Sequence, residues 1–545
     1  MPRISRGCFR CRQRRVKCDG GRPACQRCVT RNETCVGYKD ESDIIFRHET
    51  EKVVRIFRAL PVSPPRSAPS ETSELRSGRR RSCSASEAIP SGGESSRLGD
   101  YGHFPLPLDH FALEFDSPSS SWPTASTTSN ETEAGKDERA VQTFFDKYVV
   151  YPCSPGSSVG FLEHLPCLFK EVNIDGRCAL RWAVLAAAFG DASTAGFEPG
   201  LRQRALECYG NALAALGRSL AEKGKSPDDY DLMTVVILDL FETLFLPNVA
   251  PRGHHAHGMA HILRLRVTEQ FHDPRGWSLF QLAHHRIQKQ QLAFHLPPSR
   301  ESEHLLNHLD EQLAFAHLER DALQISSICT RGRAMMERLA SDKDLSITDV
   351  IQLVREMHSL DQTVVKWRTG PEWSFRTVKR LDLTGHPGIL ATFPELVQLH
   401  PDVWNAYEWN YHRTARIIMH EQLLTCLRRM SSASSPDDNV VTEMALLTPL
   451  EVESITIIQG LADKILATVP QTFGDIDHDG RVRDNTGRPP RCRAVGAYLL
   501  LWPIKIIKSQ QSSVTSAQKQ SAQGVFERIR EYTGMKSYLG NLSII

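Results

Sequence analysis

The sequence predicts two folded parts, a small cysteine-rich domain and a large all-α domain, joined by a disordered linker. Three observations predict this fold class. Six of the 14 cysteines lie within the first 35 residues and repeat one spacing. Residues 61–136 are rich in Ser, Thr, Pro and Gly and have no helical or strand period. From residue 137 onward apolar side chains recur at helical spacing, and the alternation typical of strands is scarce.

The cysteines form two halves with the same spacing, Cys8-x2-Cys11-x6-Cys18 and Cys25-x2-Cys28-x6-Cys35. In each half a CxxC pair can clamp a metal ion, to which the third cysteine returns after a short helical segment. Two tetrahedral zinc ions need eight ligand positions and six thiolates supply six, so two cysteines must bridge. Symmetry selects Cys8 and Cys25. A single zinc site would leave two cysteines unused, and a disulfide framework does not suit a chain without a secretory signal.

The residues around these cysteines resemble the fungal Zn2Cys6 (zinc binuclear cluster) transcription factors. The resemblance rests on residues 7–19 (GCFRCRQRRVKCD) and on the proline-bearing stretch Arg22-Pro23-Ala24-Cys25. It implies that residues 1–40 form a DNA-binding domain of two short helices and loops that holds two Zn²⁺ ions. It further implies a nuclear protein that regulates transcription by RNA polymerase II.

Positive charge is concentrated in the same segment. The whole chain has a formal net charge of only +2, whereas residues 1–40 carry eleven basic and three acidic side chains, or +8. Two zinc ions with six thiolates contribute −2, so the basic side chains outweigh the cluster and favour contact with phosphates. By the resemblance, Arg14 and Arg15 contact the bases of a CGG site in double-stranded DNA, and Arg12 and Lys17 contact phosphates. An arginine can bond O6 and N7 of guanine together.

Residues 41–60 follow the cluster and carry two heptads, Phe46, Thr50, Val53, Phe57 and Leu60. Two heptads are fewer than a coiled coil usually needs, so the segment is an amphipathic helix or a short dimerisation helix, and the sequence does not decide whether the chain forms a homodimer.

In the linker, Leu106 to Phe115 mixes acidic and bulky apolar residues, a composition that suits binding of a coactivator or docking on the next domain. The sequence does not decide whether the protein is an activator that binds a coactivator or a repressor that binds a corepressor.

The large domain, residues 137–545, is predicted to be all-α from stretches such as 179–187, 232–244 and 404–424. Segments including Leu499-Leu500-Leu501-Trp502-Pro503 resemble the regulatory domain of fungal zinc-cluster factors, in a subgroup common among regulators of secondary metabolism. This resemblance implies control of a metabolic gene cluster. The chain is therefore predicted not to be an enzyme.

Three motifs favour another class, an enzyme or small-molecule-binding protein with an appended zinc cluster. Residues 156–160 fit GxSxG, residues 475–480 (DIDHDG) resemble the start of a calcium loop, and four histidines gather at 254–261. The GxSxG stretch lacks the alternating strands and helices of a hydrolase fold. The calcium-type loop lacks a Glu at its twelfth position, and the histidines lack the carboxylate of an HExxH pattern. The apolar run 494–507 is short and interrupted, so we expect a soluble intracellular protein and no membrane partner.

Overall fold

The structure, a computed structural model, describes two separate portions of the chain. Around the cysteines it describes residues 11, 14, 16, 18, 19, 25–31, 33 and 35. In the second portion, here called the helical body, it describes residues 133–151, 160–175, 178–194, 200–222, 225–246, 254–266, 270–271, 273–309, 314–341, 347–366, 373–431, 438–483 and 493–535. The predicted dimerisation helix at 41–60 and the coactivator segment at 106–115 lie outside the described residues.

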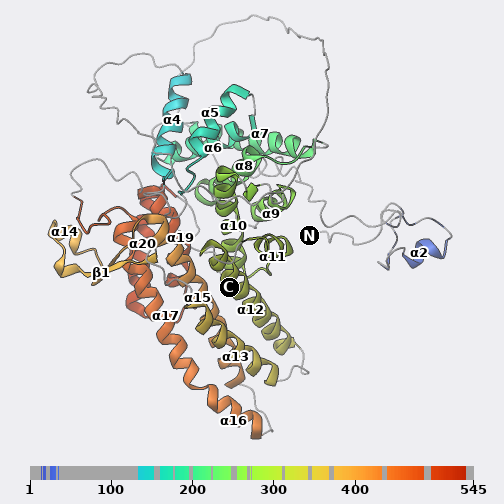
Figure 1. Ribbon diagram of the computed structural model, residues 1–545, viewed down its shortest axis with the longest axis vertical. Coiled ribbons are helices and arrows are strands. Elements are labelled where there is room, and N and C mark those ends of the chain that lie inside the picture. The colour runs from blue at the N-terminus through green and yellow to red at the C-terminus, as the bar shows by residue number, and fades with distance from the viewer. Residues whose placement is uncertain are drawn as a thin grey trace, which may run out of the picture. The chain divides into compact units, whose positions relative to one another are not determined.

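Helices make up most of the helical body (Figure 1). They are α4 (Glu133–Tyr148), α5 (Leu165–Asp175), α6 (Cys178–Thr194), α7 (Leu201–Ala221), α8 (Asp229–Phe245), α9 (His254–Arg266), α10 (Pro274–Phe294), α11 (Arg300–Leu306), α12 (Ala314–Ser341), α13 (Ile347–Val364), α14 (Pro387–Leu390), α15 (Val403–Ser431), α16 (Asp438–Leu447), α17 (Pro449–Ala467), α18 (Val469–Thr472), α19 (Arg493–Lys508) and α20 (Ser516–Thr533). The apolar stretches predicted to be helical lie within α6, α8 and α15, so those predictions are confirmed.

Two details differ from the sequence predictions. First, α4 begins at Glu133, so residues 133–136 belong to a helix and not to the linker. Asp137 in its first turns accepts a hydrogen bond from Arg204 of α7 at 2.7 Å, which ties this end of the helix to the body. Second, the body is not purely α-helical.

A pair of antiparallel strands interrupts the helices. Strand β1 (Arg376–Lys379) pairs with β2 (Leu396–Leu399), and a short 3-10 helix follows β1 at Arg380–Asp382. Strands of four residues are too short for alternation to be recognised in the sequence. The strand pair contributes Val397 and Leu399 to a small apolar cluster with Phe393.

Helix starts in the body are fixed by side-chain caps. Asp228 accepts the backbone N–H groups of residues 230 and 231 and forms a reciprocal capping box at the start of α8. Asp273 caps α10, in which Pro274 occupies the first turn. Thr515 forms a capping box with Gln518 at the start of α20. These caps satisfy N–H groups that have no partner inside their own helix.

The start of α19 packs unusually closely on α18. A Cβ atom at Gly496 would lie 1.9 Å from the backbone carbonyl oxygen of Thr472, closer than any real contact. Only glycine permits this approach. The contact fixes where α19 runs, and α19 in turn packs against α15 and α20.

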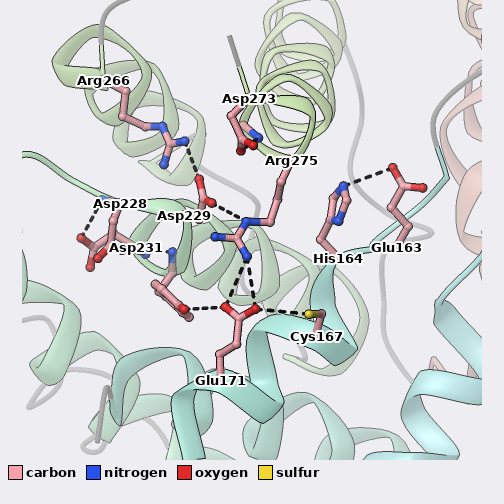
Figure 2. Close-up of polar contacts among 12 residues, drawn as sticks. Glu163, His164, Cys167, Glu171, Asp228, Asp229, Asp231, Arg266, Asp273 and Arg275 are labelled. Atoms are coloured by element: carbon pink, nitrogen blue, oxygen red, sulfur yellow. Dashed lines mark hydrogen bonds and ion pairs between the residues drawn. The ribbon is translucent and has the colours of Figure 1, made fainter. Parts of the chain in front are cut away.

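Charged side chains join the ends of three helices, α8, α9 and α10, to the middle of α5 (Figure 2). Arg275 of α10 donates to Asp229 at the start of α8 at 2.7 Å and to Glu171 of α5 at 3.2 Å. Arg266, the last residue of α9, donates to the same Asp229 at 2.5 Å. A carboxylate at a helix N-terminus and a guanidinium at a helix C-terminus both interact favourably with the helix dipoles. The network therefore holds α5, α8, α9 and α10 together.

One described segment, Thr442–Thr472, is long and apolar enough by composition to cross a membrane. It is divided into α16, α17 and α18, and α17 packs against α15 and α20. Of its apolar window 22% is buried, and a single segment of this length and composition is weak evidence for a membrane span. The expectation of no membrane partner remains a prediction.

Candidate metal centre and nucleic-acid interface

The second half of the cysteine motif is organised around a short helix, α2 (Gln26–Val29). Cys25 is its N-cap residue, and the Cys25 carbonyl oxygen accepts the backbone N–H groups of Cys28 and Val29. The carboxylate of Asp19 accepts the N–H of Gln26 at 3.0 Å. This turn brings both cysteines of the second CxxC pair to one side of the backbone.

Three thiols meet in the interior of this segment. The Sγ atoms of Cys11, Cys25 and Cys28 lie within 4.8 Å of one another, and all three residues are buried. Cys18 and Cys35 are partly buried and pack against this group. Among the described residues the five cysteines thus converge from both halves of the motif.

The thiol geometry fits a metal site better than a disulfide. The Sγ atoms of Cys11 and Cys25 are 3.7 Å apart. A disulfide requires about 2.05 Å, whereas sulfurs about 2.3 Å from a tetrahedral zinc ion are separated by roughly 3.8 Å. Cys25 also lies within 4.8 Å of Cys18 and Asp19, so it belongs to two potential ligand groups. A bridging ligand requires a thiolate that is shared in this way.

The structure locates part of the predicted DNA-contacting set. Arg14 is described, is partly buried and forms an ion pair with Glu33 from the second half of the motif. Cys8, Arg12, Arg15 and Lys17, predicted as a zinc ligand and DNA contacts, lie outside the described residues. Their roles stay predictions.

Two acidic residues have partners in this segment, although the sequence pattern assigned a role to neither of them. Asp19 caps α2, and Glu33 pairs with Arg14. Residues 1–40 contain only three acidic side chains among eleven basic ones. An isolated carboxylate in such a cationic segment is a signal that it has a specific partner.

The other motifs are used differently from the way an enzyme or a calcium site requires. Asp475 is buried and bound by Arg528 at 2.5 Å, and Asp477 accepts the N–H of Arg481 within the loop. The carboxylates of this loop therefore serve the fold.

Among the histidines, His255 is buried and lies 2.8 Å from Glu242 of α8, while His261 lies 3.0 Å from Arg264. No group of metal-ligating side chains is found on α9 among the residues described. Of the GxSxG stretch, only Gly160 is described.

Comparisons with known proteins agree with the cysteine geometry. Residues 6–43 match the family of the fungal Zn(2)-Cys(6) binuclear cluster domain. The chain is also similar to a protein named transcription factor dbaG from Emericella nidulans, with 22% identity over 386 residues, which is 68% of this chain and 83% of that protein. No solved structure matches the chain.

Proposed function

We propose that the chain is a sequence-specific, zinc-dependent DNA-binding transcription factor that acts on RNA polymerase II transcription in the nucleus. The observation that supports this proposal most strongly is the convergence of cysteine thiols within residues 6–43, the range that matches the fungal Zn(2)-Cys(6) cluster domain. The distant likeness to a protein named as a transcription factor supports the same class and favours a regulator over an enzyme.

The proposed metal centre contains two Zn²⁺ ions held by Cys8, Cys11, Cys18, Cys25, Cys28 and Cys35. Cys8 and Cys25 bridge, and the membership of Cys25 in two ligand groups supports that assignment. Zinc supplies structure here, because a segment this short has too little apolar core to fold by itself. The thiolates orient the basic segment between Cys11 and Cys18.

The proposed DNA contacts are Arg14 and Arg15 to the bases of a CGG site, and Arg12 and Lys17 to phosphates. The charge of +8 over residues 1–40 supports this, because phosphate contacts dominate affinity. The ion pair between Arg14 and Glu33 positions one guanidinium in the free protein. DNA then has to replace Glu33 as the partner of Arg14.

The test is binding of the full chain to a labelled CGG-containing duplex and to a scrambled duplex. Arg14→Ala and Arg15→Ala should each weaken specific binding by about 1–3 kcal/mol and reduce the preference for CGG. Arg31→Ala is the matched control, because Arg31 is exposed and lies beyond α2. A zinc chelator should abolish binding. Undiminished binding in both variants and with the chelator would refute the mechanism.

We further propose that the target is a metabolic gene cluster, in keeping with the resemblance of the helical body to regulators of secondary metabolism. One cluster domain reads only a few base pairs, so selectivity requires a second copy or a partner. Genome-wide mapping of occupied sites tests the target class and gives the half-site spacing. A second experiment fuses residues 61–136 to another DNA-binding domain and measures expression of a reporter gene. Increased expression indicates an activator that binds a coactivator, and decreased expression indicates a repressor.

A further inference from the structure

The helical body contains a partly open cavity of about 110 Å³ between α8, α10, α15 and α19. Most of its wall is apolar and aromatic, with side chains from α15 and α19 and from the segment before α5. The aromatic residues are Phe161, Phe294 of α10, Trp404, Tyr407, Tyr498 and Trp502. This volume is smaller than that of an engineered apolar cavity of about 150 Å³ that binds benzene, but the cavity is partly open, so a single aromatic ring can enter it without being fully enclosed.

Positive charge exceeds negative charge at the same wall. Arg286, Lys289 and Lys505 line the cavity together with a single carboxylate, that of Asp239. Asp239 is already engaged, because Arg286 and Gln290 of α10 donate to its two oxygens. Within the described residues neither Lys289 nor Lys505 forms an ion pair with a carboxylate. Asp239 attracts Lys289 at longer range and the centroid of the Tyr498 ring lies 5.1 Å from its Nζ, but among the described residues neither ammonium group has a carboxylate within ion-pair distance.

Burial makes that charge unfavourable in the free protein. Burial and the neighbouring Arg286 lower the pKa of Lys289 to about 7. Burial and Lys508 lower the pKa of Lys505 to about 8. An anion placed beside the two ammonium groups would restore the favourable charged form of both.

Two buried polar atoms at the wall also have no hydrogen-bond partner. They are Nε2 of His285 and Nε1 of Trp502, and both side chains are nearly inaccessible to solvent. His285 is held in place through its other ring nitrogen, which lies 2.7 Å from the carboxylate of Glu319. Buried polar atoms are nearly always satisfied in folded proteins. A polar group of a ligand would satisfy such an atom where it faces the cavity.

We propose that this cavity is a binding site for a small aromatic carboxylate. Its ring lies among the aromatic side chains, and its carboxylate lies between Lys289 and Lys505. Apolar walls with few convergent polar groups are the usual composition of small-molecule sites. The site lies in the helical body and is independent of the zinc cluster, so it adds a small-molecule input to the proposed regulator.

The test uses the full chain, with benzoate and 2-naphthoate as probes and benzamide and 2-naphthamide as their neutral counterparts. Binding is followed by calorimetry and by the fluorescence of the chain, since Trp404 and Trp502 line the cavity. At least one carboxylate should bind, and more tightly than its amide by about tenfold or more. Lys289→Met and Lys505→Met should each weaken that binding by a similar factor.

Lys508→Met is the matched control, because Lys508 lies one turn beyond Lys505 on α19 and stacks on Phe526 outside the cavity. At pH 6, where Lys505 is charged whether or not Lys508 stands beside it, this variant should bind the carboxylate as the unaltered chain does. Urea unfolding of each variant checks that it is folded. The proposal is overturned if neither carboxylate binds, if acid and amide bind equally, or if the three lysine variants behave alike.

Binding should also weaken as pH rises through 7 to 8, where the lysines lose their charge. The charged and titratable groups lining the cavity around them are Asp239 from α8, His285 and Arg286 from α10, Tyr407 from α15 and Tyr498 from α19. Burial raises the pKa of Tyr498 to about 12 and raises that of Tyr407 well above its ordinary value, so neither tyrosine titrates in this window. Affinity that is constant from pH 6 to pH 9 contradicts the role of the lysines.

Discussion

Gly496→Ala tests the close contact that positions α19. The added methyl group would lie 1.9 Å from the carbonyl oxygen of Thr472, and real Cβ atoms essentially never come nearer than 3.0 Å to another heavy atom. The two helices therefore have to separate by at least about 1 Å, because a backbone oxygen cannot rotate away. Overpacking of this kind costs about 1–3 kcal/mol, and we expect the upper end.

Replacing glycine by alanine also has a favourable effect, which a control isolates. Alanine stabilises a helix interior by about 1 kcal/mol relative to glycine. Gly524 of α20 has no heavy atom within 4 Å of its would-be Cβ, so Gly524→Ala should show this gain alone. The net expectation is about 2 kcal/mol lost for Gly496→Ala and about 1 kcal/mol gained for Gly524→Ala.

The assay is urea unfolding of the full chain followed by circular dichroism at the helix band. Gly496→Ala should also weaken carboxylate binding at the cavity, because Tyr498, Trp502 and Lys505 are carried by the same helix. If Gly496→Ala is as stable as the unaltered chain while Gly524→Ala shows its gain, the close approach of α18 and α19 is refuted.

Three further outcomes are expected. Lys289→Met should stabilise the chain most at pH 7 and below, because a folded pKa of about 7, below the ordinary 10.5, means that folding opposes the charged form of Lys289. The gain in stability should shrink as pH rises from 7 toward 10.5. Urea unfolding midpoints at pH 6, 7.5 and 9 measure it. A gain that does not depend on pH contradicts this reason. Asp228→Ala should cost about 1 kcal/mol through loss of the α8 cap, and Asp228→Asn, which keeps a side-chain oxygen, should cost less. Glu33→Gln should strengthen binding to the CGG duplex by up to about fivefold, since the partly exposed pair with Arg14 has to break on DNA. In an Arg14→Ala background the same change should have a smaller effect; an equal effect would show that Glu33 acts through general charge and not through Arg14.

Helix content and the convergence of the described cysteines could be predicted from the sequence, while the role of these cysteines as zinc ligands remains a prediction. Residues 179–187, 232–244 and 404–424 have a strong apolar period, and all three are helical. Five of the six predicted cysteine ligands are described and converge, because a CxxC pair and a helical return restrict where each thiol can lie. Element ends were harder to predict. The first turns of α4 carry Asp137, which is bound by Arg204 from 67 residues further along the chain, and four-residue strands leave no periodic trace.

The sequence by itself determined the zinc-cluster motif, the concentration of positive charge in residues 1–40 and the helical character of the region after the linker. Each is a local property, carried by spacing or composition within a few tens of residues. Only the tertiary structure decided which distant side chains meet. Arg14 pairs with Glu33, and the two lysines of the cavity stand on α10 and α19, more than 200 residues apart. Whether a lysine is solvated or partly buried without a contacting carboxylate depends on every element packed around it, so no local pattern in the sequence predicts it.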